Sequence, residues 1–129
     1  MVETSQPPPL ILVADDDAII RKTIDITLQH AGYRVLMAAS GVDALRACKE
    51  QNEPIMLALV DVVMPDMDGP ELVRCLRELY ADVHVIFMSG YPREMVIDRL
   101  GIHNDLADKS SYISKPFRPN ELLKRIQTE

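Results

Sequence analysis

Five short, mostly apolar runs alternate with five segments of helical periodicity along this 129-residue chain. Each run has the length of a single strand, and continuous apolar character is typical of strands that are buried on both faces. Regular alternation of strands and helices predicts an α/β fold, a doubly wound parallel sheet with helices on both faces. We expect the strands at residues 10–14, 35–38, 55–60, 83–88 and 111–114.

The intervening segments carry recognisable helix signals. Ile20, Ile24 and Leu28 recur at helical spacing, and Gly32 follows them where a left-handed cap is expected. Ser40 is a suitable N-cap for the next helix, and Pro119 suits the first turn of the last one. We expect helices at 18–31, from residue 40 onward, around 72–79, at 92–100 and from 119 onward. The long stretch before the fifth strand leaves the extent of the fourth helix open.

Composition separates a short tail from one folded domain. Residues 1–9 include three consecutive prolines, which favour extended chain, so we expect a tail or linker there and a single domain at 10–129. The chain has 14 Lys plus Arg against 20 Asp plus Glu, a formal net charge of −6. This charge opposes contact with a phosphate backbone, so we expect no nucleic-acid partner.

No apolar run approaches the length of a membrane span, and the N-terminus lacks the basic start and apolar stretch of a secretory signal. We therefore expect a cytoplasmic protein without direct membrane insertion. Cys48 and Cys75 show no metal-binding or redox spacing and fall in helical patterns, so we expect them to be reduced thiols.

Polar residues follow the predicted strands. The first strand ends in Asp15-Asp16-Asp17, the third in Asp61, the fourth in Ser89, and the fifth is followed by Lys115. Ligand sites of doubly wound sheets lie beyond the carboxyl ends of the strands. The sequence therefore predicts one site in which these side chains meet.

The chemistry of this predicted site favours a hard divalent cation. Asp15, Asp16 and Asp61 would repel one another unless a cation neutralised them, and Mg²⁺ suits carboxylate oxygens while keeping positions open for phosphate. A carboxylate can attack a phosphoryl group, and a lysine can offset the charge on its oxygens. We exclude three other aspartates, which fit an N-cap or a turn instead: Asp17, Asp66 and Asp68.

Four segments together resemble the receiver domains of two-component response regulators. They are residues 11–17, 61–69, 88–92 and 115–117, and the resemblance covers about residues 10–127. It implies a flavodoxin-like fold with strand order 2-1-3-4-5 and a signalling role that is not an enzyme acting on a separate product. A histidine kinase or histidine phosphotransfer protein would be the phosphodonor in a phosphorelay, and an unknown downstream effector would read the result.

The resemblance also implies roles for the acidic residues. Asp61 would be the phosphoacceptor, Asp16 a direct Mg²⁺ ligand and Asp15 a ligand acting partly through water. The backbone carbonyl of Val63 would complete the metal ligands that the protein supplies.

Further roles follow from the same resemblance. Ser89 and Lys115 would bind the phosphoryl oxygens, and the bond from Lys115 to Pro116 is often cis in the family. Ser89 and Tyr112 would form the switch that reports phosphorylation. The segment 88–92 is similar to receivers attached to hybrid histidine kinases, and the proline-rich lead-in suits a linker, so we keep both that origin and a stand-alone receiver open.

Two other classes of function fit parts of the pattern. A magnesium-dependent aspartyl-phosphate phosphatase usually has a second acid two residues after its nucleophile, where this chain has Val63. A flavodoxin-like binder of a nucleotide or flavin needs a phosphate-binding loop after the first strand, where residues 15–17 would repel a phosphate. Both alternatives rank below the receiver interpretation.

Overall fold

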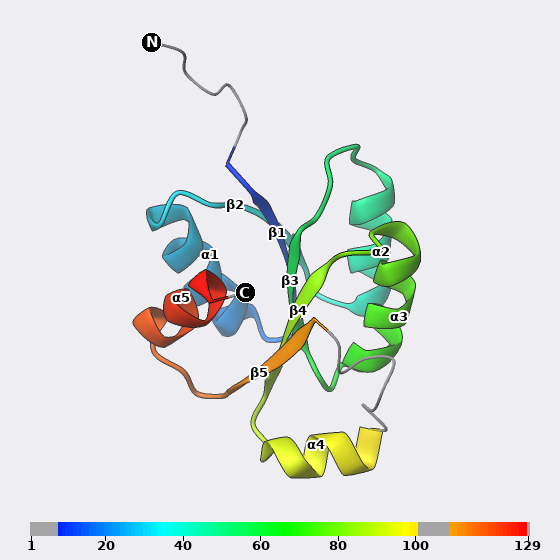
Figure 1. Cartoon of the computed structure of the whole chain (residues 1–129), viewed down its shortest axis with the longest axis vertical. Coiled ribbons are helices and arrows are strands. Elements are labelled where there is room, and N and C mark those ends of the chain that lie inside the picture. Colours follow the sequence, from blue (N-terminus) through cyan, green and yellow to red (C-terminus); the bar gives the residue numbers. More distant parts are fainter. Residues whose placement is uncertain (1–7, 101–108, 129) are drawn as a thin grey trace.

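Strands and helices alternate along the whole described chain (Figure 1). The computed structural model describes residues 8–100 and 109–128, so residues 1–7 of the predicted tail and Glu129 lie outside the description. The elements are β1 (Leu10–Ala14), α1 (Ala18–His30), β2 (Arg34–Ala38), α2 (Gly41–Lys49), β3 (Leu57–Asp61), α3 (Gly69–Leu79), β4 (His84–Ser89), α4 (Arg93–Leu100), β5 (Ser110–Ser114) and α5 (Pro119–Gln127).

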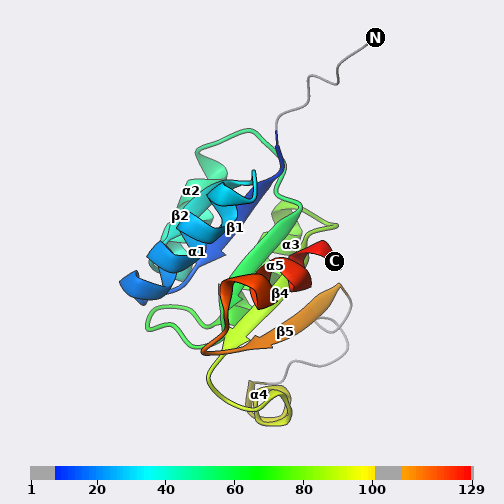
Figure 2. The ribbon, with the colours of Figure 1, turned by 90° about the vertical axis from the view of Figure 1, so that its left-hand side faces the viewer.

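The strands form one parallel sheet in the order β2-β1-β3-β4-β5. Helices α1 and α5 lie on one face, and α2 and α3 lie on the other (Figures 1 and 2). This confirms the predicted doubly wound fold and its strand order. The direction of winding reverses between β1 and β3, so the carboxyl ends of these two strands border the place where such folds bind ligands.

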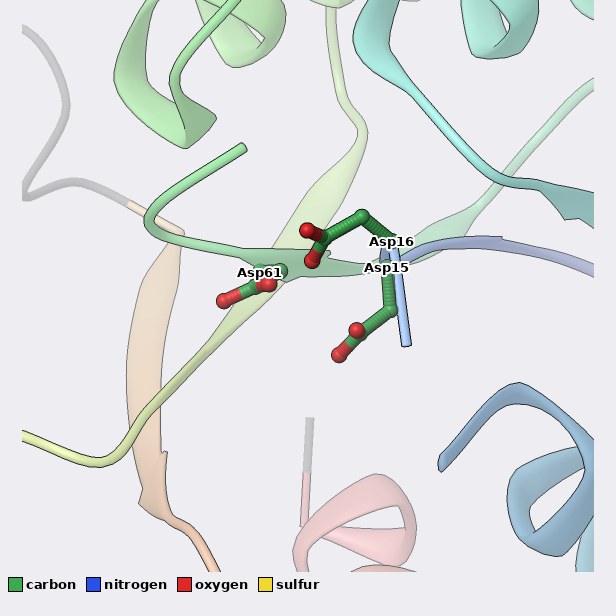
Figure 3. Close-up of side chains that lie close together, drawn as sticks. All are labelled: Asp15, Asp16 and Asp61. Carbon is green, nitrogen blue, oxygen red and sulfur yellow. The ribbon is translucent and has the colours of Figure 1, made fainter. Parts of the chain in front are cut away.

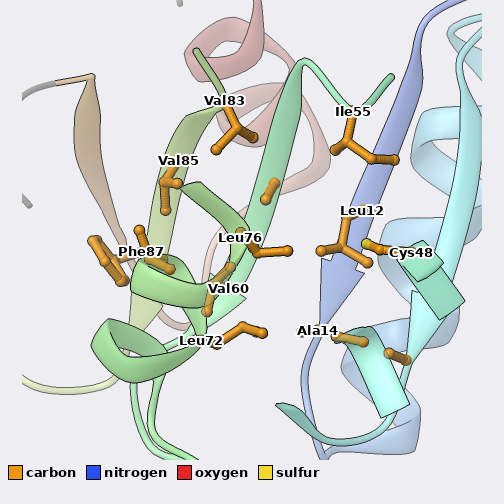
Figure 4. Packing of buried hydrophobic residues seen from close by; sticks show 14 of the residues in the cluster. Leu12, Ala14, Cys48, Ile55, Val60, Leu72, Leu76, Val83, Val85 and Phe87 are labelled. Carbon is orange, nitrogen blue, oxygen red and sulfur yellow. The ribbon is translucent and has the colours of Figure 1, made fainter. Parts of the chain in front are cut away.

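Two buried clusters hold the helices on the sheet. One joins β1, β3 and β4 to α2, α3 and Val96 of α4, and Phe87, Leu72 and Leu76 are among its largest side chains (Figure 4). The other joins the opposite face of the sheet to α1 and α5. Burial of both faces explains the continuous apolar runs, because every residue of a central strand faces one cluster or the other.

The predicted element bounds agree with the structure to within about three residues. Helix α3 begins at Gly69, three residues before the expected start, because the Asp68 side chain caps its first turn. Strand β3 begins at Leu57 and not at Ile55, since its pairing with β1 starts only at Leu57, opposite Ile11. Ile55 is nevertheless buried, so its apolar character reflects core packing outside the ladder.

The helix caps predicted from sequence are confirmed. Asp17 Oδ1 accepts the N–H groups of Ile19 and Ile20 at the start of α1, and Ser40 Oγ accepts that of Asp43 in α2. Gly32 has φ +92° just after α1, in the left-handed region that glycine adopts without strain.

Pro8 and Pro9 are tied to the edge strand β2. The backbone N–H of Arg34 donates to the Pro9 carbonyl at 3.1 Å, and its Nε donates to the Pro8 carbonyl at 3.1 Å. Arg34 also forms an ion pair with Glu53. The end of the proline-rich segment is therefore attached to the sheet, and the boundary between tail and domain stays a prediction. None of the described helices is long and apolar enough to cross a membrane.

Gly69 marks a place where α3 approaches β3 too closely for a side chain. A Cβ there would lie 2.7 Å from the Asp61 carbonyl oxygen and 3.0 Å from Val62 Cα. We expect Gly69→Ala to lower the free energy of unfolding by about 1–3 kcal/mol, because backbone must shift to accept the methyl group. Gly90→Ala is the control, since a Cβ at Gly90 has no neighbour within 4 Å. Denaturant unfolding measures both, and equal stability of the two variants would contradict the argument.

Candidate functional site

Three carboxylates meet at the carboxyl ends of β1 and β3 (Figure 3). Asp15 and Asp16 follow β1, Asp61 ends β3, and the two strands are paired side by side up to Ala14 and Val60. One carboxylate oxygen from each of the three aspartates lies within 4.8 Å of the others. The predicted acidic cluster is therefore present in the fold.

Asp15 is the most deeply buried of the three, with no exposed surface. Its Oδ1 accepts the N–H of Asp17 at 2.9 Å, and its carbonyl accepts Arg21 Nη1 at 2.8 Å. Its Oδ2 has no hydrogen-bond partner of good geometry within the described chain, although Lys115 Nζ lies 2.7 Å away. This oxygen is thus stabilised by its ion pair with Lys115.

Lys115 brings a cation to the acidic cluster from β5. Its backbone N–H donates to the Ser89 carbonyl at 2.8 Å, and its Nζ lies 2.7 Å from Asp15 Oδ2 and 3.3 Å from Asp61 Oδ1. Burial alone would lower the pKa of Lys115, but the nearby carboxylates of Asp15 and Asp61 outweigh it and raise that pKa above its usual range. The lysine is therefore charged at neutral pH. The bond to Pro116 is cis, as the resemblance implied.

One lysine does not neutralise three carboxylates. Burial, and then the negative charge of Asp15, raise the pKa of Asp61 to about 6, although Lys115 opposes both effects. The ionised form of Asp61 is therefore less favourable in this pocket than in water, and added positive charge would stabilise it.

The Ser89 hydroxyl lies at the end of β4, next to the strand that carries Asp61. The side chain is buried, and its Oγ accepts the N–H of Tyr91 at 3.0 Å. Because Oγ accepts this bond, its proton can be donated to another acceptor. Val63 lies two residues after the end of β3. Its backbone N–H donates to Asp61 Oδ1 at 3.4 Å, and the residue is 55% exposed.

Residues 11–127 match the family described as the response regulator receiver domain. The chain belongs to this family. Receiver domains are signal-transduction modules of two-component systems that are phosphorylated on an aspartate, and the acidic cluster of Asp15, Asp16 and Asp61 is the corresponding pocket here.

Curated relatives show the same domain in different contexts. Over 119 residues the chain is 38% identical to the sensor kinase CckA of Brucella abortus, covering 92% of this chain and 12% of the kinase. It is 34% identical to the response regulator receiver protein CpdR of the same organism, covering 91% of this chain and 92% of that protein. The chain spans only 48% of the transcriptional regulatory protein AruR of Pseudomonas aeruginosa, at 36% identity and 92% coverage of this chain.

Solved structures agree with the family. The chemotaxis response regulator CheY4 of Vibrio cholerae superposes with a TM-score of 0.79 at 30% identity, covering 94% of this chain and 98% of that one. The receiver domain of a hybrid histidine kinase CckA gives 0.76 at 29% identity, covering 92% and 96%. This receiver domain therefore shares its fold both with a chemotaxis response regulator and with the receiver domain of a hybrid histidine kinase.

The receiver pocket fits a hard divalent cation. All three side chains offer carboxylate oxygens, the donors that Mg²⁺ prefers, and no histidine or thiolate joins this group among the described residues. The raised pKa of Asp61 shows that burial and the nearby Asp15 disfavour its negative charge, an effect that a bound cation would oppose. The pocket could hold such an ion without rearrangement of the fold.

Tyr112 of the receiver domain lies on β5 beside Phe87 of β4. The two rings stack with centroids 5.6 Å apart, and Arg93 Cζ of α4 lies 5.2 Å from the Tyr112 ring centroid. Burial raises the pKa of Tyr112, while the Arg93 charge lowers it. The ring is thus half-buried between a neighbouring strand and α4, and its predicted role as a switch stays a prediction.

The aspartates excluded from the site have structural partners. Asp17 caps α1, as expected, and Asp68, which was expected in a turn, caps α3. Asp66 does more than form a turn, because its two carboxylate oxygens accept the N–H groups of Gly41 and Val42 at 3.2 and 2.9 Å. Gly41 and Val42 are 25 and 24 residues away along the chain, so no local sequence pattern predicts this contact.

Stabilisation by Mg²⁺ should depend on pH. The raised pKa of Asp61 means that the folded chain binds a proton more tightly than the unfolded chain, whose ordinary value is 3.8. Without metal, the free energy of unfolding therefore falls as pH rises from 3.8 to about 6. Protons compete with Mg²⁺ for Asp61 below about pH 6, so the metal should stabilise the chain more above pH 6 than at about pH 5.

Thermal melts with and without Mg²⁺ measure this difference. At about pH 7.5, free Mg²⁺ ~100-fold above its dissociation constant should add about 2.7 kcal/mol. At about pH 5 the gain should be clearly smaller, and Asp16→Asn should reduce the gain at both values. An equal rise in melting temperature at both pH values would contradict the assignment of Asp61 to the metal cluster.

Proposed function

We propose that Asp61 is the residue of this receiver domain that accepts the phosphoryl group. A carboxylate oxygen of Asp61 attacks the phosphorus atom of a phosphohistidine, the new P–O bond forms, and the P–N bond breaks with its electron pair left on the imidazole. The product is an aspartyl phosphate on Asp61 and a free histidine on the partner. The chain is thereby a signalling module whose chemistry is directed at itself.

The position of Asp61 carries the proposal. It is a buried carboxylate at a strand end, held beside Asp15 and Asp16 and 3.3 Å from Lys115 Nζ. A nucleophile that attacks a phosphoryl group needs positive charge on the same side, since the group carries its own negative oxygens. Lys115 would bind one of these oxygens, and the Ser89 hydroxyl would donate to another.

The acidic cluster would hold Mg²⁺ during the transfer. Asp16 and Asp61 would bind it directly, Asp15 partly through water, and the Val63 backbone carbonyl would complete the protein ligands. A bound divalent ion supplies charge stabilisation of the phosphoryl oxygens in such reactions. Asp15 would also keep Lys115 in place through their 2.7 Å ion pair.

A histidine kinase or histidine phosphotransfer protein would be the phosphodonor in this two-component phosphorelay. The similarity to CckA supports a receiver joined to a kinase, with residues 1–9 as linker and 10–129 as domain, and the similarity to CpdR supports a stand-alone receiver. We place the exchange in the cytoplasm, where reducing conditions would keep the free thiols of Cys48 and Cys75 reduced.

The two alternative functions gain no support from the site. The position of a phosphatase general acid holds Val63, an apolar side chain that points outward with 55% of its surface exposed. A flavin or nucleotide phosphate would need the first N–H groups of α1, but the Asp17 carboxylate already accepts two of them. The receiver chemistry is the function that the geometry supports best.

Acetyl phosphate with Mg²⁺ should label Asp61 in the wild-type chain. We expect intact-mass spectrometry to show the gain of one phosphoryl group, labile to hydroxylamine, and we expect Asp61→Asn to abolish it because an amide is a poor nucleophile. Lys115→Ala should retain metal binding and lower the labelling rate, since the lysine would bind the phosphoryl group and not the ion.

Asp17→Asn is the matched control for this experiment. It makes the same change from carboxylate to amide two residues from Asp15, and asparagine still caps α1. Labelling of Asp17→Asn should be close to that of the wild type. Wild-type labelling of Asp61→Asn would show that the phosphoacceptor is another residue.

We also propose that Ser89 and Tyr112 transmit phosphorylation to α4. A phosphoryl group on Asp61 would draw the Ser89 hydroxyl toward its oxygens, and Tyr112, which lies beside the strand of Ser89, would turn inward and leave Arg93. We expect the phosphoryl mimic beryllofluoride to change backbone NMR shifts in both the pocket and α4 of the wild type. In Tyr112→Ala the α4 response should be lost, whereas an unchanged α4 response would remove Tyr112 from the output.

A further inference from the structure

Asp66 connects the loop that leaves the pocket to a helix that contributes no residue to it. The loop between β3 and α3 starts directly after Asp61, and Asp66 lies in its middle. The Asp66 carboxylate is bidentate toward α2, with Oδ1 3.2 Å from Gly41 N and Oδ2 2.9 Å from Val42 N. Each of its oxygens thus has its own backbone donor.

These contacts complete the N-terminus of α2. The first N–H groups of a helix have no partner within it and favour negative charge. Ser40 Oγ accepts the N–H of Asp43 at 3.0 Å, and the Ser40 carbonyl accepts that of Ala44 at 3.0 Å. The Asp66 carboxylate accepts the N–H groups of Gly41 and Val42. The hydrogen bond from Val42, and then that from Gly41, hold the pKa of Asp66 below its usual range.

Packing reinforces this connection on both sides of the loop. A Cβ on Gly41 would lie 2.8 Å from Met67 Cβ, so the loop and α2 touch where only glycine fits. At the other end, Gly69 N donates to the Val62 carbonyl at 2.8 Å, which closes the loop on itself. Val63 lies between these anchors with an exposed side chain, so packing of its own side chain does not fix it.

We propose that Asp66 is a positioning residue for the receiver site. Its hydrogen bonds to the first two amides of α2 hold the loop that follows Asp61 in place. They thereby fix the backbone path of this loop, which includes the Val63 carbonyl. Occupation of the pocket by Mg²⁺ is thereby coupled to the N-terminus of α2. This inference rests on the metal site of the proposed function and extends it to a residue that touches neither the metal nor the phosphoryl group.

Coupling of this kind is reciprocal. If the Asp66 contact favours the metal-binding position of the loop, metal in the pocket favours the Asp66 contact to the same extent. The amides of Gly41 and Val42 should therefore exchange hydrogen more slowly when the wild-type chain is saturated with Mg²⁺. This measurement needs no variant, so it applies even where a substitution disturbs folding.

Calorimetric titration with Mg²⁺ alone tests the proposal. We expect Asp66→Ala to weaken binding about tenfold, the low end of the effects seen for residues that support metal ligands. Asp66→Asn keeps one carbonyl acceptor for the α2 amides, so its affinity should be intermediate.

Two controls separate positioning from general effects. Ser40→Ala also removes a cap from α2 but leaves the loop untouched, so it should lower the melting temperature without changing Mg²⁺ affinity. Asp68→Asn removes the same charge from the same loop while asparagine still caps α3, so its affinity should fall less than that of Asp66→Ala.

The outcomes distinguish failure of the positioning role of Asp66 from failure of the proposed metal site. Wild-type affinity in Asp66→Ala, or an equal loss in Asp66→Ala and Ser40→Ala, would overturn the positioning role while leaving the metal site standing. Unchanged exchange at Gly41 and Val42 on metal binding would overturn the coupling. Absence of binding heat in the wild-type chain, or wild-type affinity in Asp16→Asn, would instead overturn the metal site itself.

Discussion

Repulsion among Asp15, Asp16 and Asp61 is the interaction on which the rest of this site depends. Burying a carboxylate is unfavourable unless it is paired. Here the buried carboxylates of Asp15 and Asp61 share one lysine, and the exposed Asp16 adds a third negative charge nearby. Burial, and then the negative charge of Asp15, raise the pKa of Asp61 to about 6, so the pocket favours an added cation. Adding a further anion to this negatively charged pocket is unfavourable without that cation, so metal binding and phosphoryl transfer are connected by charge.

The sheet can hold this unfavourable cluster because the strands beneath it are buried on both faces. Val13 and Leu59 lie in one apolar cluster and Leu12 and Val60 in the other, each fully buried immediately before the acidic strand ends. Removing such side chains from water provides the free energy that opposes the repulsion at the edge. The acidic residues therefore stay together in a fold whose stability comes from other residues.

The aspartates near this edge divide into two groups, and the sequence predicts the division only in part. The capping role of Asp17 was predicted, because a cap and its amide partners lie within three residues along the chain. Asp68 was expected only as a turn residue, although its cap contact to Glu71 is equally local. The cluster of Asp15 and Asp61 was predictable too, since parallel strands place their carboxyl ends together. The role of Asp66 was not, because its partners on α2 depend on the packing of α2 against the loop.

The same distinction applies to the strands and the aromatic pair. Apolar runs located the strands, but the start of β3 at Leu57 depends on its pairing with β1, which is a property of two segments together. The resemblance singled out Tyr112, yet its stacking on Phe87 and the Arg93 charge above it required the β4–β5 register and the position of α4. Local patterns thus predict elements and caps, while contacts between distant segments need the fold.

The proposed phosphoryl ligands and the acidic residues occupy different strands, so a cation and a phosphoryl group would contact different parts of the site. Asp15, Asp16 and Asp61 lie at the ends of β1 and β3, whereas Ser89 and Lys115 lie at β4 and β5, where the Lys115 N–H donates to the Ser89 carbonyl. A cation acts mainly on the first group, and a phosphoryl group must also bind the second. Only differential contacts shift a conformational equilibrium, so the metal alone leaves β4 and β5 without a new contact. In the proposed mechanism, phosphorylation would add that contact on the two strands that carry Phe87 and Tyr112, beside Arg93 of α4. A response of α4 would therefore depend on the phosphoryl group and not on the ion.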